Sequence, residues 1–326
     1  MTEPLLRVRD LRVHFSVRAS KGWPWQAPLL LKAVDGVSFT LARGETLGVV
    51  GESGCGKSTL ARAIIGLVPA TSGDVSWQGR TLTGGTASEW RTVRRHMQMI
   101  FQDPLASLNP RMTVGDIIAE PLRTFQPGLG KTEVRRRVES MMARVGLSPA
   151  LINRYPHAFS GGQCQRIGIA RALILQPSLI ICDEPVSALD VSIQAQVINL
   201  LKDLQRELGL ALVFIAHDLS VVRHIADRVL VMYLGHGVEL ADQQALYTQP
   251  RHPYTQALLS AVPIPDPDTE RDRVPRLLQG EPPSPLDPPS GCVFRTRCPL
   301  ADEGCAQAMP RLEGPAAHQV ACFKAE

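Results

Sequence analysis

The sequence lacks the features of a secreted or membrane-spanning chain. Residues 1–6 contain no basic segment followed by an apolar core, so we do not expect a secretory signal. No apolar run approaches the length that crosses a bilayer, and residues 209–216, among the most apolar, have only the length of a β-strand. We therefore expect a cytosolic protein whose contact with any membrane is peripheral.

The chain also has little net charge. Its 35 Lys and Arg residues against 31 Asp and Glu residues give a formal charge of +4 at pH 7. This balance does not favour nucleic acid as a partner, although a mildly basic surface suits anionic lipid headgroups or another protein. The sequence shows no internal repeat and no sustained heptads, so a long coiled coil is not expected. Its 326 residues admit one large α/β domain and a smaller module.

What the chain does contain is a complete phosphate-binding loop, G-x-x-x-x-G-K-S, at residues 51–59. An apolar, strand-like run precedes it and a helical pattern follows, which is the context that the motif requires and that a chance Gly-rich turn lacks. Backbone N–H groups and the helix N-terminus would bind phosphate, Lys57 would reach the β- and γ-phosphates, and the Ser58 hydroxyl would ligate Mg²⁺. The loop consists of Gly51, Glu52, Ser53, Gly54, Cys55, Gly56, Lys57, Ser58 and Thr59. We predict that the chain binds a nucleoside triphosphate.

Two acids follow another apolar strand. Residues 179–182 lead into Asp183 and Glu184, and the carboxyl ends of parallel strands face the ligand crevice. Asp183 could hold Mg²⁺ directly or through water, and Glu184 could act as the general base toward an attacking water. The alternative is a pair of surface acids in a loop.

A third motif consists of Ser160, Gly161, Gly162 and Gln163, which precede an amphipathic helical pattern. It resembles a second anion site at a helix N-terminus, although these four residues alone are typical of a flexible loop.

Hydrophobic periodicity indicates the fold class. Residues 5–50 alternate apolar and polar positions and predict an antiparallel β-layer. The apolar strands at residues 179–182 and 212–215, each beside a helical pattern, predict a doubly wound α/β core. Residues 131–145 predict a charged amphipathic helix. Proline becomes dense after about residue 262, which predicts an extended linker before a small cysteine-containing module.

Together these motifs resemble the nucleotide-binding subunits of ABC transporters, and every family motif is present in order. They are the Walker A loop at 51–59, the Q-loop Gln102, the signature sequence at 159–163, the Walker B strand at 179–184, the D-loop at 187–190 and the switch histidine His217. The tail segments 251–255 and 289–294 are similar to oligopeptide and dipeptide importer ATPases, above all to F-type subunits of oligopeptide permeases. The insertion around Trp23 and Trp25 also suits that type.

The resemblance implies a P-loop ABC-type ATPase domain over residues 1–262. This domain would combine a RecA-like core, the antiparallel β-layer and a helical subdomain at about 104–165. A C-terminal extension of the oligopeptide-transporter type would follow at 263–326.

The resemblance also implies a composite active site. Two ATPase domains would pack head to tail, with each ATP between the Walker A loop of one and the Ser160–Gln163 loop of the other. Phe15 would stack on adenine, its alternative being an ordinary core or edge-strand residue. Gln102 would touch Mg²⁺ and the attacking water, His217 would contact the γ-phosphate, and Asp190 would communicate across the dimer.

The activity implied is ATP hydrolysis that powers import of oligopeptides or dipeptides. The partners implied are a second ABC ATPase and two transmembrane permease subunits docked on residues 104–165. The resemblance favours a D-type subunit, rather than a second copy of this chain, as the second ATPase. An extracytoplasmic peptide-binding protein would act indirectly, and the chain would lie at the cytoplasmic face of the inner membrane. One alternative is a cytosolic ABC ATPase without transport. Another is a regulatory module that has lost hydrolysis, and the intact Glu184 and His217 argue against this second alternative.

Four of the seven cysteines cluster near the C-terminus with the spacing C-x5-C-x6-C-x16-C: Cys292, Cys298, Cys305 and Cys322. Four thiolates can hold an iron–sulfur cluster, and the C-x2-C pairs of zinc ribbons are lacking. Similar importer ATPases carry a [4Fe–4S] cluster in this tail, so we expect one here in preference to zinc. Free or mixed thiols are the third possibility.

Overall fold

The computed structural model describes residues 3–18, 28–262, 278 and 280–325, so the segment with Trp23 and Trp25 and most of the predicted proline-rich linker lie outside the described residues. The chain forms two compact units. The first unit consists of Met1–Thr40, Leu47–Thr83 and Ala216–Glu326, and the second of Leu41–Thr46 and Gly84–Ile215.

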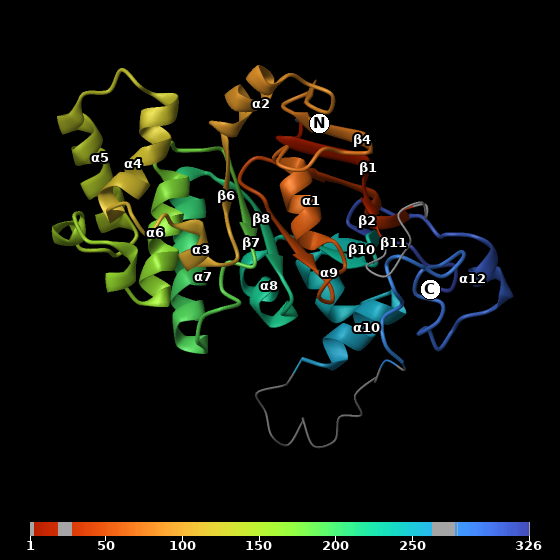
Figure 1. Ribbon diagram of the computed structural model, residues 1–326. Coiled ribbons are helices and arrows are strands. Elements are labelled where there is room, and N and C mark those ends of the chain that lie inside the picture. The colour runs from red at the N-terminus through yellow and green to blue at the C-terminus, as the bar shows by residue number, and fades with distance from the viewer. Residues whose placement is uncertain (1–2, 19–27, 263–277, 279, 326) are drawn as a thin grey trace, which may run out of the picture. The chain divides into compact units, whose positions relative to one another are not determined.

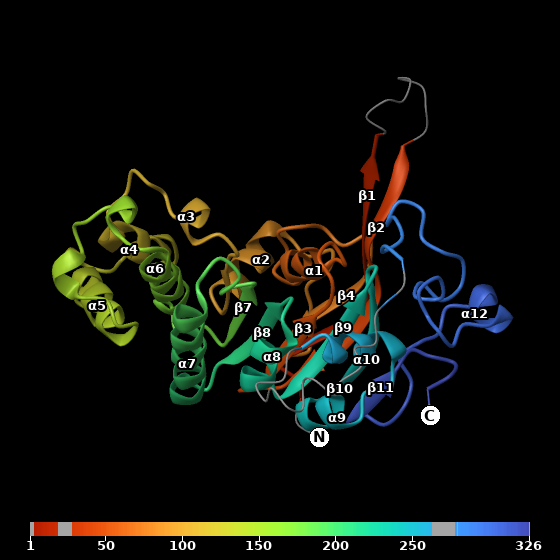
Figure 2. The same ribbon diagram turned by 90° about the horizontal axis from the view of Figure 1, so that it is seen from below.

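The first unit contains the antiparallel layer that the alternating sequence predicts. Its strands lie in the order β2-β1-β4-β5, and β1 and β2 run side by side as a long pair of ribbons (Figure 2). Leu6 pairs with Trp77, and a β-bulge interrupts the β1–β4 register between Arg9 and Arg12. The bounds are β1 (Leu6–Val17), β2 (Leu29–Leu41), β4 (Ser72–Trp77) and β5 (Arg80–Thr81).

A second set of strands in the first unit has the order β11-β10-β9-β3. Strand β3 is buried along its whole length and pairs in parallel with β9, so it does not belong to the antiparallel layer that precedes it. Strand β10 is antiparallel to both β9 and β11, and it therefore ties the C-terminal segment to this unit. The strands are β3 (Thr46–Val50), β9 (Arg228–Tyr233), β10 (His236–Asp242) and β11 (His318–Val320). The helices are α1 (Lys57–Ile64), α8 (Leu219–Ile225), α9 (Gln243–Thr248), α10 (Pro253–Ser260) and α12 (Glu303–Gln307).

The second unit carries three parallel strands in the order β8-β7-β6, which confirms the predicted parallel pairing. Strands β7 and β8 are buried at every position, as apolar strands covered on both faces should be. The strands are β6 (Met97–Ile100), β7 (Leu179–Asp183) and β8 (Ala211–Ala216), and α7 (Val191–Leu208) connects β7 to β8.

Helix α4 of the second unit packs against α5 and α6, whereas α3 packs against α6 and α2 contacts β6 (Figure 1). Helix α5 buries Val138, Met141 and Met142 on one side and pairs Arg137 with Glu133 on another, which confirms the predicted amphipathic helix. The limits of 104–165 for a helical subdomain, and the boundary at residue 262, stay predictions. The bounds are α2 (Ala87–Arg94), α3 (Pro104–Ser107), α4 (Val114–Phe125), α5 (Lys131–Arg144), the 3₁₀ turns η1 (Pro149–Leu151) and η2 (Pro156–Ala158), and α6 (Gly161–Leu173).

Within the described ranges, no helix combines the length and the apolar character that crossing a membrane requires.

Candidate active site

The phosphate loop runs from β3 to α1, and close approach of other backbone segments fixes its shape. Gly56 has φ +103°, and a Cβ atom there would lie 2.0 Å from the carbonyl oxygen of Ala33 in β2. A Cβ atom on Gly51 would lie 2.2 Å from the carbonyl oxygen of Met232 in β9. Because these contacts are with backbone atoms, which cannot swing aside, only glycine fits at either position.

Lys57 closes the loop on itself. Its side chain is buried, and Nζ donates to the carbonyl oxygens of Gly51 at 2.7 Å and Glu52 at 3.0 Å. Ser58 and Thr59 lie in the first turn of α1, and among the described residues no side chain caps that helix at Gly56. The N–H groups of the first turn and the positive end of the helix dipole therefore suit an anion.

Cys55 lies inside the loop with its Sγ atom 3.9 Å from Lys57 Nζ. Burial raises the pKa of the Cys55 thiol, and the nearby Lys57 ammonium only partly offsets that effect. The thiol form is therefore favoured at neutral pH. Ser53 and Gly54 form the exposed tip of the loop.

In the second unit, the structure brings two of the predicted catalytic residues together. Gln102 Nε2 donates to Glu184 Oε2 at 2.9 Å. Glu184 follows the last residue of β7, the buried Asp183, and has a φ of 46°, which is uncommon for a residue other than glycine. Its N–H group donates to the Ile215 carbonyl at 3.1 Å, so the neighbouring strand β8 holds this turn in place. The Glu184 carboxylate is thus oriented by both its backbone and the Gln102 amide.

The Ser-Gly-Gly-Gln motif forms the first turn of α6 through a reciprocal cap. The Gln163 N–H group donates to Ser160 Oγ at 3.4 Å, and the Ser160 N–H group donates to Gln163 Oε1 at 3.0 Å. This capping box makes the motif an ordered helix start rather than a flexible loop. The hydroxyl proton of Ser160 is not used when its oxygen accepts, so the hydroxyl keeps its capacity to donate.

Asp190 lies close to this helix start. A Cβ atom on Gly162 would lie 2.6 Å from Cγ2 of Ile193, in the first turn of α7, and Asp190 caps that turn by accepting from the Ile193 N–H group at 3.1 Å. That backbone hydrogen bond is the largest cause that holds the pKa of Asp190 below its ordinary value. The structure therefore places the Ser160–Gln163 motif and Asp190 on neighbouring helix ends.

Phe15 and His217 belong to the first unit. Phe15 lies in β1 with 36% of its surface exposed, as a ring that stacks on a ligand requires. His217 follows β8 directly and is exposed.

The expected metal cluster in the C-terminal tail is wrong. Among the described residues, no group of three or more His, Cys, Asp and Glu side chains is placed to hold a metal ion. Cys292, Cys298, Cys305 and Cys322 are all free thiols. Burial raises the pKa of Cys292 and Cys298, and repulsion with the other tail thiols raises it further. Neither a [4Fe–4S] cluster nor zinc is therefore assigned to the described residues of this tail.

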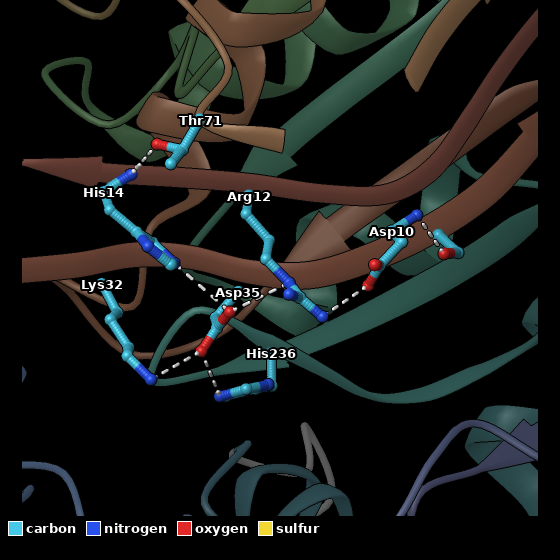
Figure 3. Close-up of polar contacts among 8 residues, drawn as sticks. Asp10, Arg12, His14, Lys32, Asp35, Thr71 and His236 are labelled. Atoms are coloured by element: carbon cyan, nitrogen blue, oxygen red, sulfur yellow. Dashed lines mark hydrogen bonds and ion pairs between the residues drawn. The ribbon is translucent and has the colours of Figure 1, made fainter. Parts of the chain in front are cut away.

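Sequence reasoning missed a charged cluster around Asp35 in β2 (Figure 3). Arg12 Nε and His14 Nε2 both lie 3.3 Å from Asp35 Oδ1, and Lys32 Nζ lies 3.4 Å from Oδ2. Burial alone would raise the pKa of Asp35, but the charges of His236 and Lys32 and the hydrogen bonds from Lys32 and His14 outweigh it and lower that pKa.

The backbone of Asp35 is connected to the phosphate loop through Gly235. The Asp35 N–H group donates to the Gly235 carbonyl at 2.8 Å, and the Gly235 N–H group donates to the Cys55 carbonyl at 2.9 Å. One signal for the cluster was present in the sequence, since Arg12 and His14 lie two residues apart in one strand and share a face.

Comparison with known proteins places these motifs in a family. The pattern described as "ABC transporter" matches residues 34–187, and that described as "Oligopeptide/dipeptide transporter, C-terminal region" matches residues 238–305. The chain is 69% identical to the oligopeptide transport ATP-binding protein OppF of Salmonella typhimurium, over 99% of this chain and 96% of that protein. It is 68% identical to the OppF protein of Escherichia coli, with the same coverage.

Solved structures show the same fold. The dimeric ATP-binding cassette MJ0796, in a post-hydrolysis state bound to ADP and Pi, superposes with a TM-score of 0.65 at 26% identity, covering 73% of this chain and 98% of that one. The cbiO1 protein of Clostridium perfringens, part of an ABC transporter complex, gives a TM-score of 0.64 at 26% identity, covering 76% and 92%. These likenesses confirm the predicted P-loop ATPase fold.

Proposed function

The chain belongs to the ABC transporter family of ATP-binding subunits, and on that premise we propose that it hydrolyses ATP to power the import of oligopeptides or dipeptides through a membrane transporter. The observation that carries the proposal is the identity of 69% with an oligopeptide transport ATP-binding protein over nearly the whole of both chains. The match of residues 238–305 to the oligopeptide/dipeptide transporter C-terminal region supports the same substrate class.

ATP binding is assigned to the loop of residues 51–59. The uncapped first turn of α1 and the loop N–H groups receive the phosphates, and Lys57 exchanges the carbonyls of Gly51 and Glu52 for the β- and γ-phosphates. The exposed ring of Phe15 stacks on adenine.

Hydrolysis is assigned to Glu184, which takes a proton from the attacking water as the general base. Gln102 orients the Glu184 carboxylate through the 2.9 Å hydrogen bond, and His217 contacts the γ-phosphate. Ser58, Gln102 and Asp183 offer the oxygen ligands that Mg²⁺ prefers, and Mg²⁺ supplies charge neutralisation of the phosphates when it is bound. Positioning and electrostatics carry most of the catalysis, because phosphoryl transfer requires little covalent chemistry of the protein.

The site is completed by a second ATPase subunit packed head to tail, of the D-type. Ser160, Gly161, Gly162 and Gln163 of each subunit cover the ATP held by the other, and the ordered cap of α6 presents the Ser160 hydroxyl for this contact. Asp190, at the neighbouring start of α7, transmits the state of one site to the other.

Two transmembrane permease subunits dock on the helical region of the second unit. Leu105 and Tyr155 in that region leave 55% and 44% of their surface exposed, so both side chains are accessible to a partner protein. The chain then lies peripherally at the cytoplasmic face of the inner membrane. A separate extracytoplasmic binding protein selects the peptide.

The test is purification of the intact complex from membranes, with its subunits identified and its ATPase rate measured with and without peptide-loaded binding protein. We expect two permease subunits and one D-type ATPase to co-purify, and the loaded binding protein to raise the ATPase rate. An active ATPase that co-purifies with no membrane subunit would instead favour a cytosolic ABC ATPase without transport.

A further inference from the structure

The C-terminal tail reaches the phosphate loop through an ion pair between residues 245 positions apart. Arg297 Nη1 donates to both carboxylate oxygens of Glu52, at 3.1 Å and 2.9 Å. The Arg297 side chain is 7% exposed and that of Glu52 27%, so solvent screens the pair only partly. Both residues lie in the first unit.

An aromatic cluster holds the arginine in place. The Arg297 guanidinium lies 5.9 Å from the ring centroid of Tyr233, and its Nη1 lies 3.5 Å from the Tyr233 hydroxyl. Tyr233 packs against Tyr254 and Phe294 with centroid distances of 4.8 Å and 5.2 Å, and all three rings are buried. Because Phe294 comes from the tail, Tyr254 from α10 and Tyr233 from β9, the cluster fixes the tail on the core of the unit.

Glu52 uses each of its polar groups to connect this cluster to the loop. Its N–H group donates to the Tyr254 hydroxyl at 2.9 Å, its carbonyl oxygen accepts from Lys57 Nζ at 3.0 Å, and its carboxylate binds Arg297. The position of Glu52 therefore determines where one of the two carbonyls under the Lys57 ammonium lies.

The charge of Glu52 matters for an anionic ligand. A carboxylate in a loop that receives a polyphosphate repels it, and Arg297 neutralises this carboxylate at hydrogen-bond distance. Removal of the arginine would leave a partly buried, uncompensated negative charge in the loop, close enough to act on Cys55, where it would repel phosphate.

We propose that Arg297 is a positioning residue for ATP: the tail, through Arg297, neutralises and holds Glu52, and so keeps Lys57 available to the phosphates. The inference rests on the proposed function. It assigns to the C-terminal tail a role in nucleotide affinity, because the tail completes the electrostatics of the phosphate loop.

The test measures ATP affinity and steady-state kinetics in the intact transporter complex. We expect Arg297→Ala to raise the KM and the Kd for ATP about tenfold, the effect of one charge-assisted contact, with kcat changed less than about twofold because binding rather than the chemical step is affected. We expect Arg297→Lys to keep nearly wild-type affinity for ATP, because a single nitrogen of Arg297 makes both contacts with the Glu52 carboxylate and a lysine ammonium can do the same. The buried Arg297 Nε has no hydrogen-bond partner among the described residues, so its loss removes no hydrogen bond seen there.

Two controls separate this role from a structural one. Arg295→Ala removes a half-buried arginine two positions away, whose guanidinium donates to Ser290 and, among the described residues, has no hydrogen bond to the loop, so the affinity for ATP should not change. The double variant Glu52→Gln with Arg297→Ala should bind ATP more tightly than Arg297→Ala alone, because the repelling charge is gone. Loss of packing alone would leave the double variant as weak as the single one.

The outcomes are distinct. Wild-type ATP affinity in Arg297→Ala, or a double variant as weak as the single variant, overturns the inference. If Arg297→Ala does not assemble, the comparison of Arg297→Lys with Arg297→Gln, which removes the charge and keeps a hydrogen-bonding side chain, takes its place, and equal affinities in these two overturn it. A wild-type complex that binds no ATP would overturn the proposed function instead.

Discussion

Lowering the pH should loosen helix α10 through His252. This imidazole is 1% exposed, and its burial lowers the pKa of His252 to about 4. Its Nδ1 atom accepts the Tyr254 N–H group at 3.1 Å as the N-cap of α10, and this requires the lone pair of the neutral ring. The Glu239 carboxylate accepts the His252 backbone N–H group at 3.0 Å and also pairs with His318.

The size of the effect follows from proton linkage. The ordinary pKa of His252 is 6.5 and the folded pKa is about 4, so between these values the unfolded form binds more protons than the folded one. Protonation of the opened form therefore costs the folded helix no stability above pH 6.5. Below pH 6.5 the folded helix loses stability progressively as the pH falls toward 4. From pH 7.5 to pH 5 the loss is about 2 kcal/mol, or about 30-fold in the opening equilibrium, at 1.36 kcal/mol for each pKa unit.

Hydrogen exchange of the α10 amides at the two pH values measures this opening, after correction for the intrinsic pH dependence of exchange. The matched variant is His252→Asn, because an asparagine side chain can accept the same cap hydrogen bond and does not titrate. We expect the protection of the wild-type helix to fall about 30-fold more than that of the variant between pH 7.5 and pH 5. An equal fall in both proteins would refute the assignment to His252.

Three further changes probe the loop and the catalytic acid. Glu184→Gln should keep ATP binding but lower steady-state hydrolysis by about 100-fold or more, since a general base contributes at least that much, and hydrolysis near the wild-type rate would disprove this role. Gly56→Ala should abolish ATP binding, because its methyl group would lie 2.0 Å from the Ala33 carbonyl at a φ of +103°; unchanged affinity in an equilibrium titration would contradict this geometry. A maleimide should modify Cys55 slowly at neutral pH, because burial raises the thiol pKa, and bound ATP should slow it further, whereas inactivation unaffected by ATP would point to another cysteine.

The features that sequence could predict depend on neighbours along the chain. The glycines and Lys57 of the phosphate loop lie within one short segment between a strand and a helix, and Asp183 follows directly from its apolar strand. The α5 helix and the parallel strands β7 and β8 also follow from local periodicity. The signature motif forms a capping box for the same reason, since its Ser and Gln are three residues apart.

The features that sequence could not predict depend on distant contacts. Glu52 and Arg297 meet only because β11 and the aromatic rings bring the tail back to the first unit. The interpretation of the tail cysteines as a metal site failed for a related reason. Cysteine spacing sets which thiols lie near one another but not whether they converge on one point, and no such convergence exists in the described part of the chain. Sequence likewise could not predict that β3 lies outside the antiparallel layer, because its partner β9 is far away in the sequence.

The central claim is that ATP hydrolysis by this chain drives peptide uptake. The most direct measurement is accumulation of a labelled oligopeptide by vesicles that contain the reconstituted complex, its binding protein and ATP on the side of the ATPase subunits. We predict that uptake requires ATP and stops in the Glu184→Gln complex. Uptake at the same rate in that complex, or ATP hydrolysis without any uptake of peptide, would contradict the account.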